Sequence, residues 1–387
     1  MLAIDPTSLE ITSDLAHRLR GHVEFLASQE LEGRKPGTPG HEAAAHSIVN
    51  TFQQAELEPL TSLKGYRQQI SPEIGDNLIG IRRAQSQSST NRWLLLGAHY
   101  DHLGKTGGRI YAGADDNAAA VAILLEVAMA LPALTQYSVA FVAFNAEEPP
   151  YKLMGSQYFL DHLPHEIENS KNLQAVIILE LMGGVHWEPL KHVVFAAGAE
   201  HSPGLYRHIK NPAFPSWKNQ ELLIKPLGMH VIEEIPLLGR TPFSDYHAFR
   251  NASVPFLFLS AGRTPRYHQP TDLPDTLHYE RMALTTHWLI NVFHQLNEDR
   301  QPYEFLPNRI DFAEEIKTLH PLITKAASRD TCIPNTSFAS LLKLKADAQW
   351  LRKLHVDKIH HQDIKRLERA SLRMQGLLAD FPAAFLL

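Results

Sequence analysis

The chain has 387 residues, of which 44% are hydrophobic and 20% are charged, a balance typical of a folded globular protein and not of a disordered one. Its 37 Lys and Arg against 42 Asp and Glu give a formal net charge of −5. No overall positive field attracts nucleic acid or an anionic membrane, so we expect neither as a partner. Cys332 is the single cysteine. This excludes an internal disulfide framework and a site built from several thiolates, so any metal must be bound by His, Asp and Glu.

The start of the sequence and its longest uncharged stretch bear on location. Residues 1–6 contain an early Asp and Pro and lack the basic and apolar regions of a secretory signal, which predicts a cytoplasmic protein unless a secreted form has been trimmed. The stretch Val127–Ala146 is interrupted by Pro132, so we expect no transmembrane helix.

The middle of the chain alternates between two kinds of pattern. Residues 41–57 follow a Gly- and Pro-rich loop and have the spacing of an amphipathic helix, whereas the small apolar residues 118–131 predict a buried helix. Short apolar runs typical of strands covered on both faces occur at Trp93–Leu96, Val139–Phe144, Val176–Leu179, Val193–Phe195 and Val254–Leu259. The alternation predicts an α/β sandwich. Residues 201–240 show few strand signals and are expected to form either a lid or a surface excursion.

The pattern changes near residue 302. Strand-like runs stop, and helical patterns appear around Leu341–Leu351 and Ile364–Leu378. We therefore predict a catalytic domain over residues 1–300 and a helical C-terminal extension over 301–387. Between Leu341 and Arg373 there are nine Lys or Arg and four Asp or Glu. A solvated helical surface or a contact for oligomerisation is favoured over anion binding.

Acidic and histidine residues follow several of the predicted strands. His99 comes after the first run, Glu147 and Glu148 follow the second, Glu180 follows the third, and His268 lies beyond the last. Ligands gather at the carboxyl ends of strands in open α/β sheets, so these are candidate site residues. Each has an ordinary alternative: a lone His is more often a hydrogen-bonded loop residue, and Asp115–Asn117 could simply cap a helix.

Together, these residues make a stronger case than any of them alone. Imidazoles and carboxylates without thiolates are ligands for zinc or a similar divalent ion. Two ions sharing one carboxylate need about five ligands, and the sequence supplies His99, Asp116, Glu148, Glu180 and His268. Glu147 is left beside a ligand, where it could take a proton from metal-activated water and pass it to a leaving amine.

These motifs resemble those of the zinc-dependent exopeptidases of peptidase family M28, of the aminopeptidase Y or bacterial leucyl aminopeptidase type. The resemblance covers residues 20–300. It is carried by Leu26–Thr38, Gly97–Gly104, Gly113–Asn117, Ala146–Glu148 and Tyr267–Asp272. It implies a three-layer α/β/α sandwich with a mixed, mostly parallel central sheet, the zinc exopeptidase fold, followed by the helical extension.

The resemblance also implies roles for individual residues. His99 and Glu180 would bind one Zn²⁺, Glu148 and His268 the other, and Asp116 would bridge them. Glu147 matches the general base, and Asp101 matches an acid that orients His99. Tyr267 could donate its phenol to the developing oxyanion. Glu180 stands where the family usually has Asp, so a single-zinc site is the alternative.

The sequence therefore predicts a metal-dependent exopeptidase acting on peptides, most simply an aminopeptidase. Two alternatives share the expected fold. A glutaminyl cyclase-like single-zinc acyltransferase would use intramolecular attack by the substrate amine, and a carboxypeptidase would cleave from the other end of the peptide. A non-catalytic binding module predicts lost ligands, whereas all five positions here carry side chains that bind metals.

Overall fold

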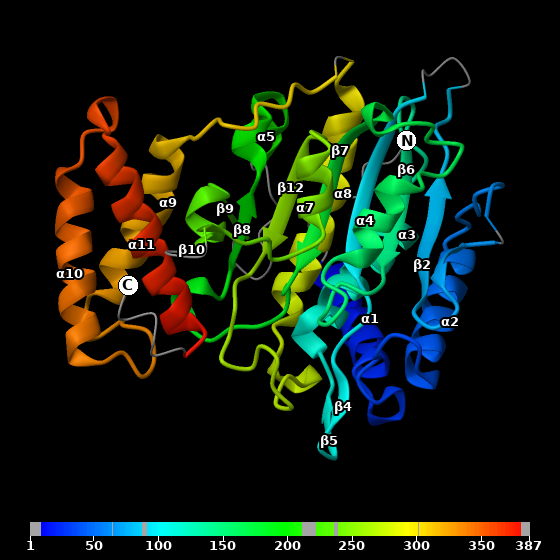
Figure 1. Ribbon diagram of the computed structural model, residues 1–387, viewed down its shortest axis with the longest axis horizontal. Helices are drawn as coiled ribbons and strands as arrows, with labels where there is room; N and C mark the ends of the chain where they lie inside the picture. Colours follow the sequence, from blue (N-terminus) through cyan, green and yellow to red (C-terminus); the bar gives the residue numbers. More distant parts are fainter. Residues whose placement is uncertain are drawn as a thin grey trace.

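A mixed eight-stranded sheet forms the centre of the computed structural model, which describes residues 9–63, 65–86, 91–210, 222–235, 239–300 and 302–380 (Figure 1). The strand order is β1-β2-β6-β3-β7-β12-β8-β9. The strands are β1 (Arg67–Ser71), β2 (Gly75–Arg82), β3 (Trp93–His99), β6 (Ser138–Phe144), β7 (Leu173–Glu180), β8 (Val193–Ala197), β9 (Leu223–Leu227) and β12 (Phe256–Ser260). The adjacent strands β6, β3, β7 and β12 are parallel to one another. Two short hairpins pair β4 (Gly104–Thr106) with β5 (Arg109–Tyr111) and β10 (Glu234–Ile235) with β11 (Gly239–Arg240).

Helices cover both faces of this sheet, which confirms the three-layer sandwich. The helices up to residue 298 are α1 (Leu9–Leu26), α2 (Pro39–Gln54), α3 (Ala119–Ala130), α4 (Met154–Asp161), α5 (Pro203–Lys210), α6 (His230–Glu233), α7 (Tyr246–Asn251) and α8 (Tyr279–Glu298). Alternate residues of β3 enter different cores: Leu94 and Leu96 pack in the cluster that includes α1, α2, α3 and α8, while Leu95 packs with residues of α4 and α7. This double burial explains why the strands are continuously apolar.

The predicted strands and helices occur where expected, but β1, β2 and β9 of the sheet were not predicted. Of these, β9 lies within residues 201–240. The described part of this segment belongs to the sheet and not to a lid or a surface excursion, because β9 is the eighth strand of the sheet and pairs in parallel with β8. Its sequence contains Lys225 and Pro226, which mask the strand signal. Pro226 is tolerated because β9 is an edge strand. Residues 211–221 and 236–238 of this segment lie outside the described residues.

Three α-helices lie between residues 302 and 380 of the described chain, where the sequence patterns predict two. They are α9 (Phe312–Ala326), which was missed, α10 (Phe338–Lys353) and α11 (His361–Leu378). We call them the helical extension; they lie beside β9 at one end of the sheet (Figure 1). Among the described residues, the extension shares its apolar core with the sheet, because Ile323 and Met374 belong to one cluster with Val193 and Leu227. None of the described helices is long and apolar enough to cross a membrane.

His230 on α6 connects the extension to the sheet through two carboxylates. Its Nε2 lies 2.8 Å from Glu315 Oε2 of α9, and its Nδ1 lies 3.1 Å from Glu368 Oε1 of α11. Burial alone would lower the pKa of His230, but the two carboxylates outweigh it and raise the pKa from 6.5 to about 9. The protonated imidazole therefore stabilises the docked extension.

This ion-pair cluster predicts a specific pH dependence of stability. The contribution of His230 is fully present below about pH 6.5 and is lost as the pH rises towards 9, because the folded-state pKa is the higher one. We expect the free energy of unfolding to fall by on the order of 2–3 kcal/mol more in the wild type than in His230→Gln between pH 6 and pH 9.5. Urea unfolding of both proteins at the two pH values measures this difference, and parallel pH profiles would contradict it.

Candidate active site

The candidate site lies where four neighbouring parallel strands end. His99 is the last residue of β3 and Glu180 the last of β7, while Glu147 and Glu148 follow β6. His268 belongs to the loop after β12. The carboxyl ends of parallel strands meet at one edge of a sheet, so side chains distant in sequence converge there. All five predicted ligands and Glu147 are brought together at this edge.

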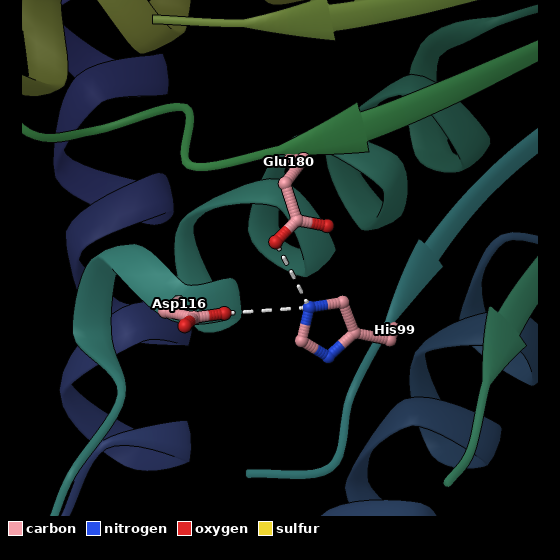
Figure 2. Close-up of side chains that lie close together, drawn as sticks. All are labelled: His99, Asp116 and Glu180. Carbon is pink, nitrogen blue, oxygen red and sulfur yellow. Dashed lines mark hydrogen bonds and ion pairs between the residues drawn. The ribbon is translucent and has the colours of Figure 1, made fainter. Parts of the chain in front are cut away.

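Three of these ligands form a first group around His99 (Figure 2). The Nε2 atom of His99 lies 3.3 Å from Glu180 Oε1 and 3.4 Å from Asp116 Oδ1. All three side chains are buried. The Ser244 hydroxyl donates a 2.7 Å hydrogen bond to the other Glu180 oxygen. The extra methylene of Glu180, relative to Asp, therefore does not keep its carboxylate from reaching the site.

The second group faces the other oxygen of Asp116. His268 Nε2 lies 3.2 Å from Asp116 Oδ2 and 3.1 Å from Glu148 Oε2. Asp116 thus presents one oxygen to each group, the arrangement of a bridging carboxylate.

His102 also belongs to this second group, and the sequence reasoning missed it. Its Nδ1 lies 2.8 Å from Glu148 Oε1 and 4.0 Å from Asp116 Oδ2, so a potential metal ligand set is formed by His102, Asp116 and Glu148. His102 lies three residues after His99 in the same segment, and this position could have indicated it as a ligand. Spacing along the chain alone does not tell which of two such close histidines binds a metal.

The turn that carries Asp116 is held by a network of buried polar contacts. The backbone N–H groups of Asp115 and Asp116 donate to the Asp272 carboxylate at 2.9 and 3.1 Å. The side chain of Asn117 donates to the carbonyl of Leu179. Gly113 begins the turn with φ 62°, and an added Cβ would lie 2.3 Å from the Asp116 carbonyl oxygen, so only glycine fits.

Arg34 secures the same region from the interior. It is fully buried, and its guanidinium donates to the backbone carbonyls of Tyr100, Ala112 and Gly113 at 2.9, 2.7 and 3.0 Å. These carbonyls adjoin His99 and the Asp116 turn. Arg34, which belongs to the family-like segment Leu26–Thr38, thus joins the two loops that carry His99 and Asp116.

Asp101 faces His99 and also has further partners. Its oxygens accept backbone N–H bonds from Glu147 at 3.1 Å and Glu148 at 3.3 Å, and one lies 3.7 Å from His99 Nδ1. The main-chain carbonyl of Asp101 is the closer partner of His99 Nδ1, at 3.3 Å. Asp101 therefore positions the segment that carries the predicted base as well as facing His99.

Backbone conformation also marks the site. Ala146, Leu181 and His268 have φ values of 58°, 52° and 55°, a region that residues with a Cβ seldom occupy. Each lies next to or within a ligand-bearing segment. Such local strain is tolerated where the surrounding structure fixes it, and it is common at functional sites.

The site concentrates negative charge in a buried volume. Burial, followed by repulsion from Glu180 and Glu148, raises the pKa of Glu147 well above its ordinary value. Burial alone would lower the pKa of His268, but Asp116 and Glu148 raise it to about 10. The carboxylates thus stabilise a nearby cation. Without a metal ion, that cation is the protonated imidazole of His268.

The donor set and its unmet contacts fit divalent cations. Both carboxylate oxygens of Asp116 and Nε2 of His268 are buried, and although they lie 3.2 to 3.4 Å from partners of the two groups, none of them makes a well-aligned hydrogen bond among the described residues. Buried polar atoms of this kind are costly unless an ion or a proton compensates them. Two divalent cations would provide this compensation, since the His and carboxylate side chains form two groups that share Asp116.

Tyr267 stacks on the ring of His268. The two ring centroids are 3.9 Å apart with an interplanar angle of 17°, and the guanidinium of Arg263 lies 4.5 Å from the centroid of the Tyr267 ring. Tyr267 thus borders the second ligand group, and its predicted role as a donor stays a prediction.

Comparison of the sequence with models of known protein families identifies the family of this chain. The model of peptidase family M28 matches residues 77–293, more than half of the chain. The chain belongs to peptidase family M28. The matched region contains every predicted ligand, whereas the helical extension lies outside it.

Individual relatives of this M28 peptidase are distant. The uncharacterized protein YfbL of Escherichia coli strain K12 is 24% identical over 227 residues, which span 52% of this chain and 66% of that protein, just under two thirds of its length. The fold is similar to BSAP, a zinc aminopeptidase from Bacillus subtilis, with a TM-score of 0.55 at 14% identity over 76% of this chain and 98% of that one. It is also similar to Fimbriiglobus ruber glutaminyl cyclase, with a TM-score of 0.52 at 17% identity over 72% and 94% of the two chains.

Proposed function

We propose that this M28 peptidase is a zinc-dependent aminopeptidase that removes amino-terminal residues from peptides. The observation that carries the proposal is the pair of ligand groups joined by Asp116, with Glu147 beside them. His99 and Glu180 would hold one ion, Glu148 and His268 the other, and His102 is an additional candidate for the second. The zinc aminopeptidase of similar fold supports both the metal and the direction of cleavage.

The residues divide the chemical work. Ions bound at the two groups would supply Lewis acidity that polarises the scissile carbonyl and favours loss of a proton from water. Glu147 lies with Oε2 4.0 Å from His99 Nε2, at the edge of the first group. It would accept the proton of the attacking water and deliver it to the leaving amine. Burial and the neighbouring carboxylates raise its pKa above the ordinary value, which favours holding the proton between its uptake from water and its delivery to the amine.

A glutaminyl cyclase is the second candidate, because a cyclase shares the fold and Glu180 departs from the usual Asp. The close contacts of Glu180 with His99 favour two ions over one, and so favour the aminopeptidase.

Three further expectations stay predictions. They are the division into a catalytic domain over 1–300 and an extension over 301–387, the cytoplasmic location, and oligomerisation through the extension.

Mass spectrometry of a mixed peptide panel tests the function. We expect zinc-loaded protein to shorten peptides with free amino termini and to leave amino-terminally acetylated peptides intact. Exhaustive chelation should abolish this activity, and added Zn²⁺ should restore it. Ammonia loss from amino-terminal Gln without hydrolysis would assign the cyclase, and shortening of acetylated peptides from the other end would assign a carboxypeptidase. Full turnover after chelation would refute the metal mechanism.

A further inference from the structure

A mostly apolar pocket of about 110 Å³ lies beside the candidate metal centre. Glu180 and Tyr267 line it, so it is continuous with the site. One water molecule needs roughly 10–15 Å³, and the pocket therefore has room for a side chain of several heavy atoms. Leu181, Phe243 and Phe258 form part of its apolar lining.

The opposite wall of this pocket comes from the helical extension. Leu319 and Leu322 of α9 and Met374 and Leu378 of α11 line it. The M28 match ends at residue 293, so this wall is built by a part of the chain that the family region does not contain. Gln375 of α11 donates a 3.0 Å hydrogen bond to the carbonyl of Val231, which holds α11 against α6 at the same place.

We infer that α9 and α11 form the wall that receives the substrate's amino-terminal side chain, and that this wall selects large apolar residues such as Leu, Met or Phe. The inference rests on the proposed aminopeptidase function. Burying an apolar side chain between Leu322 and Met374 removes it from water, whereas a charged side chain would lose its hydration against these two residues.

One cation borders the pocket and offers a competing basis for selection. The guanidinium of Arg263 lies 4.8 Å from the centroid of the Phe243 ring and 4.5 Å from that of the Tyr267 ring. It is held between two aromatic faces and is one charged group in a lining dominated by Leu, Phe and Met. Selection of acidic residues by Arg263 is therefore the outcome that the experiment must separate from apolar selection.

The test compares substrates that differ only in the amino-terminal residue. With the zinc-loaded full-length protein we expect kcat/KM for Leu to exceed that for Ala roughly 50-fold, because three further carbon atoms are buried. Leu322→Trp narrows the pocket from α9 and should lower this Leu-to-Ala ratio at least about 10-fold. Met374→Ala widens it from α11 and should raise the ratio of naphthylalanine to Leu about 5-fold.

Leu342→Trp is the matched control, because Leu342 lies on α10 with 51% of its surface exposed and does not line the pocket. Its ratios should equal those of the wild type. Each ratio is measured within one sample, so a reduced fraction of folded protein cancels from it. If Leu322→Trp does not fold, the result for Met374→Ala tests the inference. Unchanged ratios in the folded pocket variants, or fastest cleavage of Asp or Glu, overturn the inference while leaving the aminopeptidase intact. Wild-type inactivity on every peptide refutes the proposed function and the inference with it.

Discussion

Replacing Glu147 with Gln is expected to lower kcat about 10³-fold while the bound metal stays at the wild-type level. Gln has the shape of Glu but cannot accept a proton from water. Its backbone N–H can still donate to Asp101, so the loop after β6 should keep its position. Peptide hydrolysis together with elemental analysis of the purified variant measures both parts of the prediction.

The same substitution at an exposed position separates this effect from a general effect of lost charge. Glu30 is exposed and remote in sequence from every predicted ligand, so Glu30→Gln should retain full activity. If Glu147→Gln kept most of its activity, the proton would have to move through another group, and the base would be reassigned. If it lost metal as well, Glu147 would be acting as a ligand.

Asp116→Asn should cost both ions, because its two oxygens face different ligand groups. The amide removes the negative charge and replaces one oxygen by a nitrogen that donates hydrogen bonds. We expect fewer than one ion per chain and a fall in kcat/KM of at least about 10³-fold. His268→Ala touches one group only and should lose one ion and most of the activity.

Metal titration by calorimetry distinguishes these outcomes. Two binding steps in the wild type should become one in His268→Ala and weaken strongly in Asp116→Asn. Asp14→Asn, at an exposed position on α1, provides the matched control and should bind metal like the wild type. Retention of two tightly bound ions by Asp116→Asn would rule out the bridging role.

Five strands of the central sheet, β3, β6, β7, β8 and β12, could be predicted from the sequence because each is a nearly continuous apolar run. Leu94–Leu96 and Val139–Phe144 have this property, and the structure places their side chains in two different cores. β9 could not be recognised, because an edge strand accepts Lys225 and Pro226. α9, the first helix of the extension, was missed; Pro321 lies inside it, and an internal proline argues against a helix.

The candidate site was predictable to the extent that its residues directly follow strands. His99, Glu148 and Glu180 share this position, so spacing along the chain was enough to find them. The role of His102 depends on which way a loop turns after β3, and the reach of Glu180 depends on Ser244 and on the Asp116 turn. These are tertiary contacts, which one-dimensional patterns do not contain. The pocket wall formed by α9 and α11 also depends on tertiary contacts, so the sequence pattern does not predict it.

The docking of α9 on β9 has a consequence for how copies of the protein can meet. An uncovered edge strand invites strand pairing between molecules, which leads to aggregation. Here α9 packs against β9, the hydroxyl of Thr318 donates a 2.6 Å hydrogen bond to the carbonyl of Pro226, and Pro226 itself has no N–H to offer. The packing of α9 and the lack of an N–H at Pro226 thus oppose extension of the sheet by a second chain at this edge, and they favour contacts between copies through the outer faces of the helices.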